Sequence, residues 1–251
     1  MLTLNFRQFL CPLTALILLT ASALSASAQM TVHTVVPGTS DPWLAGMPAG
    51  STASIGDVAP DQSPVLVSGF TLKGGNRLTF AATGSVSYQG GTPSDPPDGN
   101  FSYDTGHINN LSTADENGIS DVTMPVDAML GVFLGPDQPN LSAAPGALDF
   151  TLQASQDYLS LSPELKQVFF IGDGMTSTSI LQQVIAPIGA TRLYLGNMDG
   201  FDWIGNTGAF NADVTNLDAA PVPESSANVS LGLLLVLGAG SVLAWRKGAA
   251  R

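Results

Sequence analysis

One loop of this sequence gathers residue types that bind a hard metal ion. Residues 197–208 read Asn-Met-Asp-Gly-Phe-Asp-Trp-Ile-Gly-Asn-Thr-Gly and lie between two predicted strands. The side-chain oxygen donors in this loop are Asn197, Asp199, Asp202, Asn206 and Thr207. Calcium takes about six to eight oxygen ligands of these carboxylate, amide and carbonyl kinds. The acids do not alternate as in an EF-hand, and the alternative is a solvated hairpin in which Asp and Asn form turns.

The sequence offers little for covalent or zinc chemistry. It contains no Gly-x-Ser-x-Gly elbow, no Walker loop and no Gly-x-Gly-x-x-Gly motif. With one cysteine, Cys11, and two histidines, His33 and His107, a catalytic triad would depend on a single histidine. We therefore expect a protein that is not an enzyme. A glycoside hydrolase with an Asp/Glu pair is the alternative, because carboxylates are plentiful although no spacing marks a pair.

Charge and composition exclude several classes of protein. The 251 residues include 20 Asp and Glu against 8 Lys and Arg, a net charge of −12. Between residues 29 and 220 the balance is 19 acidic to 4 basic, a net −15. An acidic chain repels phosphates, so a nucleic-acid partner is not expected. The 44% of hydrophobic residues argues against a disordered chain, and the scarcity of Lys and Arg argues against a helical bundle.

The middle of the chain has the pattern of an all-β domain. Residues 29–64 are rich in Pro, Gly and Ser and are predicted to be a leading linker or a loosely packed strand. From 65 to 217, alternating or apolar runs are separated by turn signals, most clearly at 78–86. Further strands are predicted at 128–134, 168–171, 184–186, 191–195 and 209–214. This pattern predicts an antiparallel β-sandwich or jelly roll.

The N-terminus is predicted to be a secretory signal peptide, residues 1–28. Arg7 supplies a positive charge, residues 9–24 are nearly all apolar, and Ala26-Ser27-Ala28 forms a small-residue cleavage site. Cleavage there would remove Cys11 and leave a chain without thiols or disulfides. The alternative is a short buried helix.

The C-terminus is predicted to carry a second targeting signal. A linker, 218–228, contains Val222-Pro223-Glu224 and precedes a transmembrane segment, 229–245, and a basic end, 246–251. An apolar helix of about 17 residues just spans a membrane, and the basic end would stay in the cytoplasm. This order resembles the PEP-CTERM sorting signal of bacterial exported proteins. The resemblance implies inner-membrane anchoring, recognition by an exosortase-type enzyme, and transfer to the cell surface or extracellular matrix. A plain single-span anchor is the alternative.

A second resemblance concerns the β domain. Three segments carry it: 78–88, which ends in Ser-Tyr; the turn Pro97-Asp98-Gly99-Asn100; and 193–210, which contains the last two strands and their loop. They resemble the PA-I type galactophilic lectin domain, a calcium-dependent jelly roll with a galactose-binding-like fold. The resemblance implies that calcium is held by the Tyr88 carbonyl, Asp199 and Asn206. It places Asp202 near a family threonine and leaves Asn197 as a spare donor.

The sequence departs from that family in several places. Gly205-Asn206 stands where the family has two adjacent Asn, the spacing from Asp199 to Asn206 is one residue shorter, and residues 136–163 are extra. The family's sugar-holding His and Gln have no secure match. The candidate sugar-binding residues are Asp98, His107 and Trp203. Sugar hydroxyls would complete the calcium shell while an aromatic ring, Trp203 or Phe201, covers the apolar face of the sugar; otherwise both rings close the end of the sandwich.

We therefore expect an exported, surface- or matrix-sorted carbohydrate-binding protein that uses calcium. One alternative is a structural matrix or envelope protein with no small ligand, and the other is the hydrolase described above. The expected partners are an extracellular polysaccharide or glycan, the sorting enzyme and the membrane.

Overall fold

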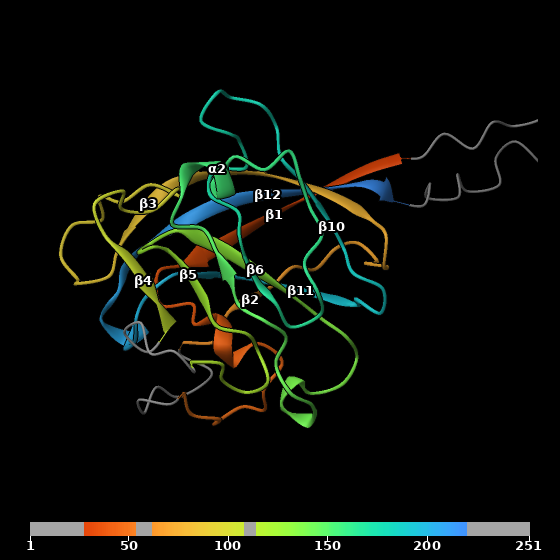
Figure 1. Cartoon of the computed structure of the whole chain (residues 1–251), viewed down its shortest axis with the longest axis horizontal. Helices are drawn as coiled ribbons and strands as arrows, with labels where there is room; N and C mark the ends of the chain where they lie inside the picture. The colour runs from red at the N-terminus through yellow and green to blue at the C-terminus, as the bar shows by residue number, and fades with distance from the viewer. Residues whose placement is uncertain (1–27, 54–61, 108–113, 220–251) are drawn as a thin grey trace, which may run out of the picture.

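The computed structural model describes residues 28–53, 62–107 and 114–219 (Figure 1). Strands are the main regular structure of these residues and helix is scarce, which confirms the all-β expectation. The strands form sheets of five, four and three strands. The helical elements of the described residues are the single turns η1 (Pro42–Leu44), η2 (Pro139–Leu141) and η3 (Trp203–Gly205), and α2 (Gln153–Gln156).

The five-stranded sheet has the order β1-β12-β3-β10-β8. Its strands are β1 (Ala28–Pro37), β3 (Arg77–Ser87), β8 (Ser160–Leu161), β10 (Gln183–Ile185) and β12 (Thr207–Ala219). In β12, Phe210, Ala212 and Val214 are buried, whereas Asn211 and Asp213 between them are exposed. This alternation, visible in the sequence, is what a strand with one face on a core requires.

Of the two alternatives predicted for residues 29–64, a linker or a loosely packed strand, the start of the segment forms a strand, β1, which is paired along its length within this sheet. It pairs with β12 from Ala28 opposite Ala219 to Pro37 opposite Ala209. Val36 is buried and Val35 exposed, so β1 also alternates. The alternation in β1 is hard to see in the sequence, because the Pro, Gly and Ser residues of the loops that follow it dominate the composition of residues 29–64.

The four-stranded sheet, in the order β2-β11-β6-β9, and the three-stranded sheet, in the order β4-β5-β7, complete the structure. Their strands are β2 (Val65–Leu66), β6 (Met129–Leu134), β9 (Val168–Phe170) and β11 (Arg192–Asn197), then β4 (Asp104–Gly106), β5 (Val122–Pro125) and β7 (Leu148–Asp149). Buried residues of the two larger sheets, such as Phe80 and Phe210 on one and Phe133 and Leu195 on the other, belong to one hydrophobic core.

Two strand pairs are parallel, so the expectation of purely antiparallel pairing is wrong at these places. They are β5 with β7 and β8 with β10. Both β7 and β8 lie in the extra segment 136–163, which adds a two-residue strand to each of two sheets. The other strand pairs of the described residues are antiparallel.

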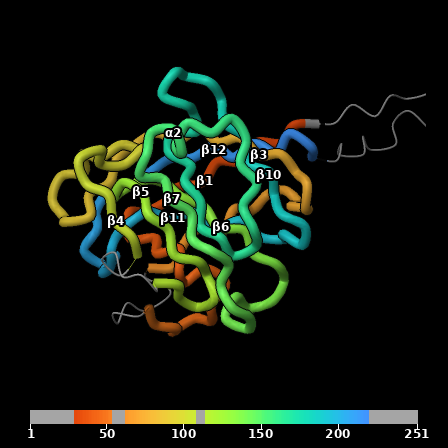
Figure 2. The backbone as a smooth tube through the Cα atoms, viewed as in Figure 1, coloured from red at the N-terminus to blue at the C-terminus, as the bar shows by residue number. Residues whose placement is uncertain are grey.

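Strand β12 determines where the ends of the described chain and the candidate loop lie. Ala219, at its end, pairs with Ala28, so the described chain begins and ends side by side (Figures 1 and 2). Thr207, at its start, pairs with Ser87 of β3. Thirteen residues of strand span about 40 Å, so the loop before β12 lies at the far end of the sheet from Ala219.

Candidate cation-binding site

The register of β3 and β12 brings two predicted ligands together. Ser87 is opposite Thr207, and these are the last residue of β3 and the first of β12. Tyr88 and Asn206 are the next residues beyond that pair. The strand pairing therefore brings the end of β3 next to the end of the candidate loop, as the predicted ligand set requires.

The carbonyl group of Gly38, just after β1, orients two side-chain amides. It accepts hydrogen bonds from Asn197 Nδ2 at 3.2 Å and from Asn206 Nδ2 at 3.1 Å. Each amide therefore has its Oδ1 atom on the side away from Gly38. Both Oδ1 atoms are buried and have no hydrogen-bond partner among the described residues.

Asp199 contributes a third buried oxygen to the same place. Its side chain is 6% exposed, its Oδ1 accepts the N–H of Gly200 at 2.6 Å, and the amide of Asn206 also interacts with the carboxylate. Its Oδ2 is buried without a partner in the described part of the chain. Buried polar atoms in native proteins nearly always have partners, so the side-chain oxygens of Asn197, Asp199 and Asn206 are the candidate ligands of this site.

The sequence interpretation missed Asp127, which lies in the turn between β5 and β6. Its residue is completely buried and its backbone is left-handed, with φ of 65°. Its Oδ2 accepts the N–H of Tyr88 at 3.0 Å, and its Oδ1 accepts Nδ2 of Asn197 at 3.2 Å. A lone Asp between two apolar residues gives no local signal of these contacts, since its partners are distant in sequence.

Burial shapes the electrostatics of this site. It raises the pKa of Asp199 to about 6, although hydrogen bonds from Asn206 and Gly200 act in the opposite direction. Burial likewise raises the pKa of Asp127 far above its ordinary value, and the neighbouring carboxyl group of Asp95 adds to the effect. A nearby cation would favour the ionised form of both groups.

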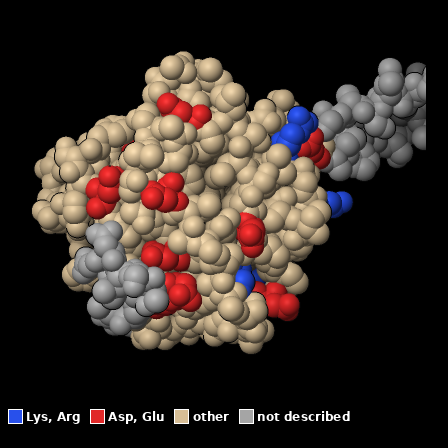
Figure 3. Space-filling view, in the orientation of Figure 1, with Lys and Arg blue, Asp and Glu red and all other residues tan. Residues whose placement is uncertain are grey.

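A hollow of about 450 Å³ opens beside Asp199. It is lined by Tyr88, Gln89, Tyr103, Asp199, Gly200, Phe201, Asp202 and Gly205. The rings of Tyr88 and Tyr103 are 5.9 Å apart between centroids, and Phe201 is 41% exposed. No Lys or Arg is among these lining residues, and acidic side chains are spread widely over the face in Figure 3 while basic ones are sparse. The hollow thus combines carboxylate charge with aromatic surface.

No three His, Cys, Asp or Glu side chains within residues 28–53, 62–107 and 114–219 lie close enough to hold a metal by themselves. The arrangement fits calcium nevertheless, because calcium accepts amide and carbonyl oxygens together with a single carboxylate. Among the predicted ligands, the structure brings Tyr88, Asn197, Asp199 and Asn206 together. Asp202 is exposed and left-handed, with φ of 63°, and it lines the hollow next to them.

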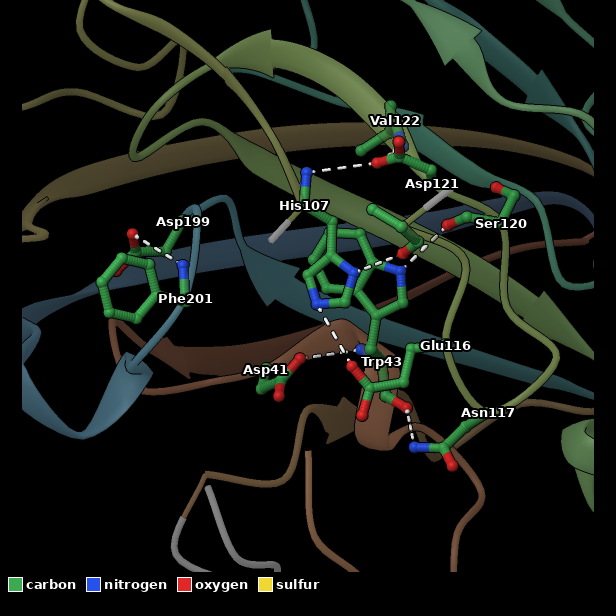
Figure 4. Close-up of polar contacts among 11 residues, drawn as sticks. Asp41, Trp43, His107, Glu116, Asn117, Ser120, Asp121, Val122, Asp199 and Phe201 are labelled. Atoms are coloured by element: carbon green, nitrogen blue, oxygen red, sulfur yellow. Dashed lines mark hydrogen bonds and ion pairs between the residues drawn. The ribbon is translucent and has the colours of Figure 1, made fainter. Parts of the chain in front are cut away.

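The predicted sugar-binding residues are dispersed. Trp203 is buried, and its Nε1 donates to the carbonyl of Asn197 at 2.9 Å, so its ring supports the loop and is not available to a sugar. His107 is also buried, and its ring stacks on Trp43 at 3.7 Å between centroids (Figure 4). Burial lowers the pKa of His107 to about 4. Neither Trp203 nor His107 lines the hollow. The exposed aromatic ring that the candidate loop contributes to the hollow is that of Phe201.

Asp98 lies in a second hollow, of about 360 Å³, away from the cation site. Its Oδ1 accepts the N–H of Asp173 at 2.9 Å, and both residues line the hollow with Asp157 and Phe101. Burial raises the pKa of Asp98, and the charges of Asp173 and Asp157 add to this effect. Hence this predicted sugar contact does not belong to the cation site.

The sorting-motif residues Val222, Pro223 and Glu224 lie outside the described residues, as do the predicted signal peptide up to residue 27 and the predicted transmembrane segment. Among the helices of the described residues, none has the length and apolar character needed to cross a membrane. Comparison with models of known protein families, with curated proteins and with solved structures finds no match.

Proposed function

We propose that this protein is an exported carbohydrate-binding protein whose β domain holds a calcium ion between Asn197, Asp199 and Asn206. The observation that supports this most directly is the group of three buried side-chain oxygens without partners. Each buried acceptor without a donor costs about 1–3 kcal/mol. A calcium ion would satisfy all three, and the Tyr88 carbonyl and the exposed Asp202 would be within the same group of donors.

The proposal includes a β-sandwich of the jelly-roll kind found in PA-I type galactophilic lectins. The shared core of the two larger sheets and the pairing of Ser87 with Thr207 support it. The resemblance also requires the strand-end Tyr88 to meet the late loop, and Asp127 links the two by accepting from both Tyr88 and Asn197.

The ligand we propose is a neutral glycan. When bound, calcium supplies a positive charge that attracts sugar hydroxyl groups. Phe201 and Tyr103 offer exposed ring surface beside the site, onto which the apolar face of a sugar could pack. The carboxylate of Asp202 can accept hydroxyl hydrogens. Anionic polysaccharides are disfavoured, because the region between residues 29 and 220 has a net charge of −15.

We also propose export and anchoring through the two ends of the chain, with sorting by an exosortase-type enzyme at Val222-Pro223-Glu224. The pairing of Ala28 with Ala219 puts the first and last described residues at one end of the sheet. The cation site lies at the other end, about 40 Å along β12. A domain tethered through residue 219 would therefore present its glycan site away from the membrane, at the cell surface or in the matrix.

Calcium titration of the full chain tests the metal part of the proposal. Calcium at about 100 times its Kd should stabilise the fold by about 2.7 kcal/mol, and EGTA should reverse the change in Tm. Asp199→Ala should abolish the response, whereas Asp137→Ala, at an exposed loop position, should retain it. An unchanged Tm in wild-type protein at millimolar calcium would reject the cation site.

A glycan array, read with calcium and with EGTA, separates the lectin from a structural matrix protein. Calcium-dependent retention of neutral glycans supports the lectin. Calcium binding without any retained glycan would favour the structural alternative.

The hydrolase is a second candidate because of the hollow that contains Asp98. A carboxyl group with a raised pKa beside a second carboxylate is the arrangement that glycoside hydrolysis uses. Turnover of a polysaccharide that disappears in Asp98→Asn, while calcium binding persists, would favour this candidate.

A further inference from the structure

Asp127 joins three separate segments at the proposed cation site. Its own N–H donates to the carbonyl of Met198 at 2.7 Å, and its two carboxylate oxygens accept from Tyr88 and Asn197. The turn before β6, the end of β3 and the end of β11 are thereby held by one buried residue. Tyr88 and Asn197 both belong to the proposed ligand group.

Two of the side-chain contacts of Asp127, those with Tyr88 and Asn197, demand an acceptor at each oxygen, and the carboxyl group of Asp95 is a third neighbour of this side chain. The backbone of Tyr88 and the Nδ2 of Asn197 are both donors. A carboxylate can accept both, whereas the amide of an Asn in its place would direct its own NH₂ group at one of the donors. Asn tolerates left-handed backbone about as well as Asp does, so this replacement changes the hydrogen bonding and not the shape.

These contacts determine which atom of Asn197 is left for a ligand. Nδ2 of Asn197 has Asp127 Oδ1 and the Gly38 carbonyl as its two acceptors, each at 3.2 Å. If the side-chain amide of Asn197 were rotated by half a turn, its Oδ1 atom would face the Gly38 carbonyl and Asp127 Oδ1. Both are acceptors, so the rotated orientation is unfavourable. Asp127 and Gly38 together therefore fix the position of Asn197 Oδ1, which is buried and has no hydrogen-bond partner among the described residues.

We propose that Asp127 is the positioning residue of the cation site, which holds Tyr88 and Asn197 where calcium requires their oxygens. This inference rests on the proposed calcium site. Residues that hydrogen-bond to metal ligands typically change metal affinity about 10- to 100-fold when they are replaced. Asp127→Asn should therefore weaken calcium binding by this factor.

The matched control is Asp121→Asn. Oδ1 of Asp121 also accepts two N–H groups, from His107 and Val122, but it contacts none of the proposed ligands. The full chain and both variants are titrated with calcium, and the Tm of each is measured in EGTA. Terbium emission lifetimes in H₂O and D₂O then count the water molecules on the bound ion, a quantity that a change in stability alone does not alter.

The expected result is a 10- to 100-fold loss of affinity and additional bound water in Asp127→Asn only. Suppose that the wild type binds calcium and that Asp127→Asn binds it with the same affinity and the same number of water molecules on the ion. This result would overturn the positioning role of Asp127 but leave the cation site standing. Equal loss in both variants would show mere destabilisation and also overturn it. No calcium binding by the wild type would overturn the site and the role together. If Asp127→Asn does not fold, Asp127→Ser, which keeps one acceptor, replaces it.

Discussion

The side-chain amide of Asn206 donates a 3.1 Å hydrogen bond to the carbonyl of Gly38, 168 residues earlier in the chain. The candidate loop is thereby attached to the segment that follows β1. Because the same carbonyl also accepts from Asn197, the segment after the N-terminal strand takes part in building the proposed cation site.

Gly38→Ala should damage the site through this carbonyl. The added Cβ would lie 2.8 Å from the Thr207 carbonyl oxygen and 3.3 Å from Val86, so the backbone at residue 38 must shift. We expect weaker calcium binding and a lower Tm. Gly146→Ala is the control, because its Cβ would meet no atom within 4 Å. Isothermal titration of both variants checks the prediction, and equal affinities would contradict it.

Asp199 should contribute a loss of stability to the calcium-free protein as pH rises from about 4 through 6, opposed over the same range by the gain that buried His107, with its lowered pKa, contributes. Burial raises the pKa of Asp199 from 3.8 to about 6, so the folded state binds this proton more tightly than the unfolded state. The resulting stability is complete below the ordinary pKa and is lost as pH passes the folded-state value. The difference is worth about 3 kcal/mol.

Denaturant unfolding between pH 4 and pH 7.5 measures this loss. Asp127, whose pKa is also raised, should extend the fall to higher pH. Saturating calcium should diminish the Asp199 contribution, because the ion favours the carboxylate form, and Asp199→Asn should remove that contribution while the His107 contribution remains. A difference in stability between the wild type and Asp199→Asn that stays the same over this range without calcium would disagree with the raised pKa of Asp199.

Phe201→Ala should weaken glycan binding without altering calcium binding. Loss of an exposed ring that covers a sugar face should lower affinity about 5-fold, since such contacts contribute about 1 kcal/mol. Ile204→Ala serves as the control, as this residue is 59% exposed on the same loop but does not line the hollow. Glycan affinities of both variants at saturating calcium decide the point. Equal losses in the two variants would exclude a specific contact with the ring of Phe201.

Trp203→Phe should lower stability through the loop and leave direct sugar contacts intact. The variant loses the 2.9 Å hydrogen bond from Nε1 to the Asn197 carbonyl, which is worth about 1 kcal/mol. Thermal unfolding and glycan binding at saturating calcium would be measured together. A large loss of glycan affinity at unchanged Tm would restore Trp203 to the role of a sugar contact.

Prediction from the sequence succeeded where the signal is local. The alternating residues of β3 and β12 and the apolar runs of β6 and β9 were found because a strand with one or two buried faces shows it within a few residues. The sequence did not decide between a linker and a strand for β1, since its partner β12 is almost the whole domain away in the chain.

The oxygen-rich loop could be recognised from neighbouring residues, because donor type and spacing are properties of the chain. The group of atoms that could hold the ion depends on packing between distant segments. Gly38, Tyr88 and Asp127 meet the loop only after β1, β3 and β6 have taken their places. Burial then raised the carboxyl pKa values and enclosed Trp203 and His107, because exposure is a property of the folded chain and not of a residue type.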